Sequence, residues 1–150
     1  YCGNNGCFEI YCGENYILSN AQKLLEEDRC EILYDLVNNK NKPLSIETFF
    51  EARNLGSIKV HRLLSTAAEY LGSALVSLYN LYDPDRIIIS GSIVEADGYV
   101  LDLALAEAKR KVLNRYTRDI SVSLAKLKTS EQEKAICADV LNRTLDQLIG

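Results

Sequence analysis

The chain has 150 residues, of which 47% are hydrophobic and 25% charged, and its formal net charge is −4. This length and composition predict one globular domain with a core, and no run approaches the ~20 consecutive apolar residues that span a bilayer. The acidic balance argues against nucleic-acid binding by this part of the protein, and a cytoplasmic location is the default expectation because no signal-peptide pattern is present.

The first nine residues, YCGNNGCFE, combine two cysteines, turn-forming residues and a carboxylate. Cys2 and Cys7 have the spacing at which two thiolates can converge on one tetrahedral metal ion, and the glycines between them permit a sharp turn. Structural zinc nearly always has four protein ligands, so the pattern predicts half of a zinc site whose other ligands lie upstream of residue 1 or elsewhere in the fold. The competing interpretation is a pair of reduced thiols in a surface turn.

The remaining cysteines and the single histidine receive separate interpretations. An odd cysteine count without a secretory signal favours metal ligands and buried thiols over disulfides. Cys30 and Cys137 lie in helical patterns and are expected to be small core side chains. Cys12 is close enough in sequence to turn toward the same ion, although a non-ligand role is favoured. His61 is expected to be a solvated helix residue rather than a ligand.

Four segments are predicted in the first half of the chain. Apolar residues at helical spacing predict an amphipathic helix over 14–28, and the polar stretch 38–43 predicts a loop. Ser45 is an expected N-cap for a helix that closes near Gly56, and Ser57 begins the longest helix. The apolar face expected for that longest helix consists of Val60, Leu64, Ala67, Leu71, Ala74, Leu75 and Leu78.

The second half predicts a strand, a helix, a strand and a last helix. The run at 86–90 contains three consecutive isoleucines and is typical of a central strand buried on both faces. A helix over 100–112 and a strand over 120–124 complete a βαβ unit with a parallel, right-handed connection. A capping-box pattern at 130–133 opens the last helix. The inner side expected for that helix carries Ala138, Leu141, Leu145 and Leu148.

Two parallel strands cannot by themselves cover five helices, so further strands are expected outside this chain, in a preceding segment or a partner chain.

The cysteine segment resembles the C-x-C-G-x-x-G-C-x-E signature of the ROK family, which contains bacterial sugar kinases and sugar-responsive repressors of the NagC, Mlc and XylR type. Tyr1 would occupy the position between the first two cysteines of that signature. The segments ARNLG at 52–56, YLG at 70–72 and NLYDPDR at 80–86 resemble, in order, the family's A-R-x-G-D, Y-L-G and N-L-x-N-P-x-x-I-x-I-G-G run. The resemblance extends from residue 1 to about residue 148.

The resemblance implies an α/β fold class, with this chain as the C-terminal part of an actin-like, ribonuclease-H-like lobe that is helix-rich and carries the βαβ unit. It implies that Glu9 accepts hydrogen bonds from sugar hydroxyls, whereas without it a solvated carboxylate is the simpler interpretation. It also implies that Cys2 and Cys7 bind Zn²⁺ together with a histidine and a cysteine upstream of residue 1.

Two functions remain open. In ROK kinases the turn after the strand at 86–90 resembles Gly-Gly-Gly and brings backbone amides to the nucleotide, whereas here it is Ser90-Gly91-Ser92. This departure favours the effector domain of a repressor, which binds a sugar or sugar phosphate and contacts DNA only through an N-terminal helix-turn-helix outside this chain. The alternative is part of an ATP-dependent sugar kinase, whose catalytic aspartate would lie upstream. A homo-oligomer is expected, and Tyr79 and Tyr82 are candidates for its surface, with core packing as the other interpretation.

Overall fold

The computed structural model describes residues 6–27, 30–113, 120–126, 131, 134–141 and 144. The elements in chain order are α1 (Glu9–Cys12), α2 (Glu14–Glu26), α3 (Glu31–Tyr34), the π-helix η1 (Asp35–Asn39), α4 (Ile46–Asn54), α5 (Ile58–Tyr82), β1 (Ile87–Ile89), α6 (Ser92–Glu95), α7 (Tyr99–Lys111) and β2 (Val122–Leu124). Residues 134–141 are also helical. The result is a helix-rich α/β fold with a two-stranded parallel sheet.

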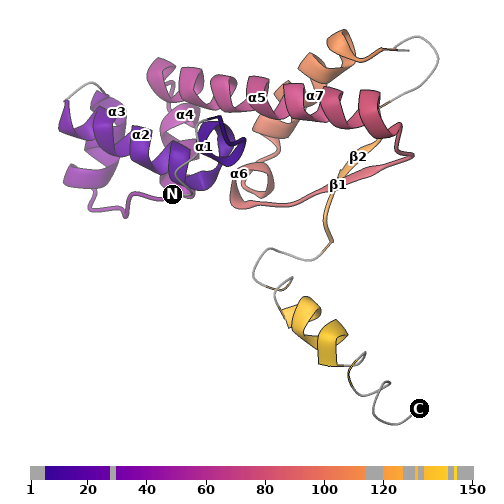
Figure 1. Cartoon of the computed structure of the whole chain (residues 1–150). Helices are drawn as coiled ribbons and strands as arrows, with labels where there is room; N and C mark the ends of the chain where they lie inside the picture. Colours follow the sequence, from indigo (N-terminus) through magenta and orange to yellow (C-terminus); the bar gives the residue numbers. More distant parts are fainter. Residues whose placement is uncertain are drawn as a thin grey trace.

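The long helix α5 organises the body of the molecule. Figure 1 shows α1, α2, α3 and α4 gathered along one half of α5, while the sheet lies near its other end. Helices α1, α2, α4 and α7 all contact α5, and α7 does so most extensively. None of the helices in the described part of the chain is long and apolar enough to cross a membrane.

Both predicted serine caps are confirmed. The Ser45 side chain accepts a hydrogen bond from the backbone N–H of Thr48 at 3.3 Å, and α4 begins at the next residue after Ser45. The Ser57 hydroxyl accepts from the N–H of Val60 at 3.4 Å and begins α5 in the same way. These bonds satisfy amides that have no partner inside the helix, which explains why a short polar side chain stands at each start.

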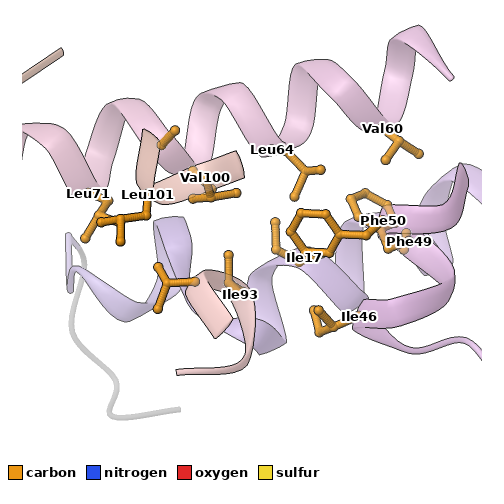
Figure 2. Close-up of a cluster of buried hydrophobic side chains, with 14 of the residues drawn as sticks. Ile17, Ile46, Phe49, Phe50, Val60, Leu64, Leu71, Ile93, Val100 and Leu101 are labelled. Atoms are coloured by element: carbon orange, nitrogen blue, oxygen red, sulfur yellow. The ribbon is translucent and has the colours of Figure 1, made fainter. Parts of the chain in front are cut away.

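The core lies between α5 and the shorter helices. In Figure 2, Leu64 of α5 faces Ile17 of α2 and Phe49 of α4, and each of these side chains is fully buried. Leu33 and Leu36 are fully buried as well, and they belong to α3 and η1, which the sequence analysis did not predict.

The predicted pairing of the strands is confirmed, but the predicted burial is not. Ile87 pairs with Val122 in a parallel register that continues to Ile89 and Leu124. Ile87 and Ile89 are half-buried against the core, whereas Ile88 is 67% exposed. Alternate strand residues point to opposite faces, and among the described residues the core covers only the face of Ile87 and Ile89. The expectation that the strand is buried on both faces is therefore wrong for this part of the protein.

The last helix also departs from expectation. Figure 1 shows residues 134–141, in yellow, apart from the rest of the molecule. Leu141 is 63% exposed, and Ala138 and Cys137 are exposed too, so the core positions predicted for them are wrong here. Leu145, Leu148 and most of the predicted capping box lie outside the described residues. Leu78 of α5, expected on the apolar face, is exposed as well.

Helices α5 and α7 approach closely because Gly72 has no side chain. A Cβ at this position would lie 2.8 Å from the backbone oxygen of Ala104 and 3.0 Å from Cβ of Glu107, both on α7. Further along α5, Tyr79 is buried, and its hydroxyl donates to the carbonyl oxygen of Ser121 at 2.7 Å. The core interpretation of Tyr79 is thus confirmed.

Arg53 joins α4 to the start of α7. Its guanidinium donates to the carboxylate of Asp97 at 2.7 Å and lies 4.1 Å from the ring centroid of Tyr99 and 5.7 Å from that of Phe50. Both partners of the ion pair are more than two-thirds buried, with side-chain exposures of 17% and 27%. This partly buried contact, which combines an ion pair with cation–π packing, accounts for the arginine in the ARNLG segment.

Candidate functional site

Glu9 is the first residue of α1 and is exposed. The sequence analysis predicted no helix at this position, whereas residues 9–12 form a single helical turn closed by the hydrogen bond from the N–H of Gly13 to the carbonyl of Glu9 at 2.8 Å. Gly6 has φ +84°, so the chain enters this turn through a left-handed residue.

Gly13 lies directly against Glu9. A Cβ at residue 13 would lie 2.6 Å from the backbone oxygen of Glu9 and 2.9 Å from its Cγ. The backbone of Gly13 is extended, with φ −77° and ψ 166°, a conformation that any residue adopts. Close approach to Glu9, rather than backbone conformation, is therefore what requires a glycine here.

The second part of the site is the turn between β1 and α6. Gly91 has φ +136° and ψ 148°, a region that is essentially restricted to glycine. Its N–H donates to Oε1 of Glu95 at 3.0 Å, and its carbonyl accepts from the N–H groups of Val94 and Glu95. The hydroxyl of Ser92 donates to Oε2 of Glu14, the first residue of α2, at 2.5 Å.

The structure brings these two parts together around one pocket. A cavity of about 230 Å³ is lined both by Glu9 and Glu14 and by the Ser90-Gly91-Ser92 turn. Its lining residues are Phe8, Glu9, Cys12, Gly13, Glu14, Leu71, Ile89, Ser90, Gly91, Ser92, Ile93, Val94 and Val100. Figure 2 shows Leu71, Ile93 and Val100, three apolar residues of this lining, in the core beside it.

Two carboxylates supply hydrogen-bond acceptors to this otherwise largely apolar pocket. Carboxylates accept hydrogen bonds from hydroxyl groups, and such charge-assisted bonds are stronger than neutral ones. Two carboxylates at one pocket repel an anion such as a phosphate. In addition, two donors of the turn already have acceptors within the protein. The amide of Gly91 donates to Glu95, and the hydroxyl of Ser92 donates to Glu14.

The expected zinc ligands are only partly within the described residues. Cys7 is half-buried just before α1, whereas Cys2 lies outside the described part of the chain. Within that described part, no group of three or more histidine, cysteine, aspartate or glutamate side chains could hold a metal. A thiolate from Cys7 fits zinc chemically, and it would need donors from outside the described residues.

Cys12 and His61 each lie next to a local partner in the structure. Burial, aided by the negative charge of Glu9, raises the pKa of the Cys12 thiol from 9.0 to about 11, and its sulfur lies 3.5 Å from the carbonyl oxygen of Phe8. His61 is exposed on α5, with Nδ1 2.8 Å from the hydroxyl of Tyr99, which confirms it as a solvated helix residue. Cys30 is buried, as expected.

The three residues of the YLG segment on α5 each have a different structural role. Tyr70 stacks on Tyr11 of α1, with ring centroids 4.6 Å apart and an interplanar angle of 27°. Leu71 lines the pocket, and Gly72 admits α7. These contacts connect α5 both to the helix that carries Glu9 and to the core behind the β1–α6 turn.

Sequence reasoning identified Glu9 and the turn, which the structure brings together, but did not connect them to their neighbours. It treated Glu14 only as a helix-start residue and did not single out Gly13 or Glu95. The role of Glu95 could have been predicted from its spacing, since a carboxylate four residues after Gly91 can accept a hydrogen bond from the amide of that glycine. The bond between Ser92 and Glu14 joins residues 78 positions apart, and no local pattern predicts it.

The curated proteins to which this chain is similar include several transcriptional repressors. The chain is 25% identical to the DNA-binding transcriptional repressor Mlc of Escherichia coli K12, over 81% of this chain and 29% of that protein. It is 24% identical to the xylose repressor of Bacillus subtilis 168, over 98% of this chain and 34% of that protein. The chain therefore spans roughly a third of the length of these curated relatives.

Solved structures share the fold. A ROK family glucokinase from Streptomyces griseus, in complex with glucose and AMPPNP, superposes with a TM-score of 0.68 at 21% identity, over 85% of this chain and 42% of that one. A ROK family transcriptional regulator homologous to Mlc superposes with a TM-score of 0.66 at 22% identity, over 83% of this chain and 30% of that one. The ROK family model matches residues 1–144, and the chain belongs to the ROK family.

Proposed function

We propose that this chain is the C-terminal part of the sugar-binding effector domain of a ROK-type transcriptional repressor, in which Glu9 accepts hydrogen bonds from the sugar. The names of the curated relatives support a repressor, since they include the xylose repressor and the N-acetylglucosamine repressor. In the intact protein, a helix-turn-helix N-terminal to this segment would contact DNA, and sugar binding would change its affinity by favouring one arrangement of the domains.

One observation carries the choice of a repressor over a kinase. The amide of Gly91 and the hydroxyl of Ser92, the donors that a nucleotide phosphate would need at this turn, are bonded to Glu95 and Glu14. A phosphate would have to displace two carboxylates and would meet a third, Glu9, at the same pocket. Phosphoryl transfer depends on positioning and on positive charge around the phosphates, and this turn supplies neither.

Sugar binding is tested by calorimetric titration of the intact protein with glucose, xylose and N-acetylglucosamine. Glu9→Gln is expected to weaken the binding of the preferred sugar by roughly tenfold to 100-fold, because a charge-assisted hydrogen bond becomes a neutral one. Glu31→Gln is the matched control, since Glu31 is also an exposed first residue of a four-residue helix. Equal affinities for the wild type and Glu9→Gln would refute the role of Glu9.

The repressor and kinase functions are separated by two measurements on the intact protein. A coupled assay with ATP and the same three sugars is expected to detect no sugar-dependent turnover, and turnover above background would assign the protein to the kinases. DNA fragments selected from a random pool are then titrated with and without the preferred sugar. A change in DNA affinity supports the repressor, whereas unchanged affinity contradicts it.

We further propose that Cys2 and Cys7 bind one Zn²⁺ per chain, together with donors from outside this chain. The ion would stiffen the turn that precedes Glu9. Metal analysis of the intact protein is expected to give about one zinc per chain, and Cys7→Ser is expected to lower that value and to weaken sugar binding. Cys137→Ser, which changes an exposed cysteine on a different helix, is the control and should retain the metal. A wild-type protein without zinc would contradict the assignment.

A further inference from the structure

Helix α1 presents Glu9 but is too short to hold its own orientation. It has four residues, and the hydrogen bond at its C-terminal end runs from the N–H of Gly13 to the carbonyl of Glu9. Isolated helices of this length are unstable in water, because fixing the first turn is unfavourable. The direction of the Glu9 carboxylate therefore depends on what packs against α1.

The first contact comes from α5. The rings of Tyr11 and Tyr70 lie in an offset stack, with centroids 4.6 Å apart, and Tyr70 is anchored in a helix of 25 residues. Tyr11 lies two residues after Glu9, so a displacement of its ring turns the whole of α1.

The second contact comes from the start of α2. The missing side chain of Gly13 leaves room for the backbone oxygen and Cγ of Glu9, which would lie 2.6 Å and 2.9 Å from an added Cβ. Any side chain at residue 13 must displace the Glu9 side chain, its backbone, or both. Both contacts are made close to Glu9 in the sequence, one with α5 and the other with the residue that begins α2.

We infer that Tyr70 and Gly13 are positioning residues for sugar recognition, which set the direction of Glu9 through the Tyr11 stack and through close backbone contact. This inference rests on the proposed function. Neither residue needs to touch the sugar. Tyr70 acts from α5 through Tyr11, and Gly13 acts by leaving space.

The test uses the intact protein and calorimetric titration with glucose, xylose and N-acetylglucosamine. Tyr70→Ala is expected to weaken binding of the preferred sugar roughly fivefold to tenfold, while Tyr70→Phe, which retains the stacked ring, keeps wild-type affinity. Gly13→Ala is expected to weaken binding by about tenfold or more, because it moves the carboxylate itself. Tyr34→Ala is the matched control, since Tyr34 is 42% exposed against 41% for Tyr70 and lies on a different helix.

A double-mutant cycle separates positioning from a general structural effect. In the Glu9→Gln background, Tyr70→Ala and Gly13→Ala are expected to cause little further loss, since the group they orient has been neutralised. Equal losses in both backgrounds, or wild-type affinity in both single variants, would overturn the inference. If Gly13→Ala does not fold, the comparison of Tyr70→Ala with Tyr70→Phe decides.

The outcome for the proposed function is distinct. If the wild type binds none of the three sugars, or Glu9→Gln binds as well as the wild type, the proposed role of Glu9 fails and the inference fails with it. If Glu9→Gln loses affinity and the positioning variants do not, only the inference fails.

Discussion

The close packing of α5 on α7 predicts that Gly72→Ala destabilises the protein. The new Cβ would lie 2.8 Å from the backbone oxygen of Ala104, whereas ordinary contacts begin at 3.4 Å, so the helices must separate locally by about 0.6 Å. Overpacking of this kind costs about 3 kcal/mol when backbone must move, and the better helix propensity of alanine returns about 1 kcal/mol. The net loss is therefore about 2 kcal/mol, or roughly 4–8 °C in melting temperature.

Thermal unfolding of the intact protein, followed by circular dichroism, measures this shift. Ser73→Ala is the control, because Ser73 is the next residue on α5, is exposed, and should change the melting temperature little. Glu107→Ala added to Gly72→Ala should not restore stability, since the shortest contact is to a backbone oxygen. A melting temperature for Gly72→Ala at or above that of the wild type would refute the reasoning.

Two further predictions concern single side chains. Arg53→Ala should destabilise the protein by about 1–2 kcal/mol through loss of the Asp97 ion pair and the packing on Tyr99, while Arg62→Ala at an exposed position of α5 should be nearly neutral in the same denaturation assay. Because the pKa of Cys12 is raised from 9.0 to about 11, its alkylation by iodoacetamide at pH 8 should be about 100-fold slower than that of an unperturbed thiol. Peptide mass spectrometry measures this against exposed Cys137, and similar rates at both would contradict the raised pKa. The raised pKa also means that the fold favours the neutral Cys12 thiol over the thiolate. The contribution of Cys12 to the free energy of unfolding is therefore fully present below about pH 9 and is lost as the pH rises through about 11.

Local signals in the sequence predicted the longer helices α2, α4, α5 and α7, but not the short helices α1 and α6. Ser45 and Ser57 are short polar residues before apolar repeats, and each caps a helix as expected. The helices α3 and η1 were missed, although Leu33 and Leu36 lie three residues apart on one face. The polar stretch 38–43 predicted a loop, whereas η1 extends to Asn39, so the loop begins later than expected.

Burial was predicted less well than secondary structure, because burial depends on neighbours rather than on pattern. Three consecutive isoleucines indicate a strand, but covering both faces requires a layer on each side, and Ile88 faces none among the described residues. The site was predicted in the same partial way. Glu9 and Gly91 were identified from motifs, whereas their proximity and the partners Glu14 and Glu95 depend on tertiary contacts.

Gly13, Gly72 and Gly91 differ in what prevents another residue from taking their place. Gly91 is excluded from substitution by its own torsion angle, since no atom lies within 4 Å of the Cβ it lacks, so no change in a neighbour can relieve the strain of an L-residue there. Gly13 and Gly72 are excluded by adjacent atoms, and a shift of those atoms can in principle accommodate a methyl group. Over evolutionary time, a substitution of Gly13 or Gly72 can therefore be compensated by a change in a neighbouring residue. A substitution of Gly91 cannot be compensated in this way, so sequence variation at this turn is expected at Ser90 and Ser92 instead.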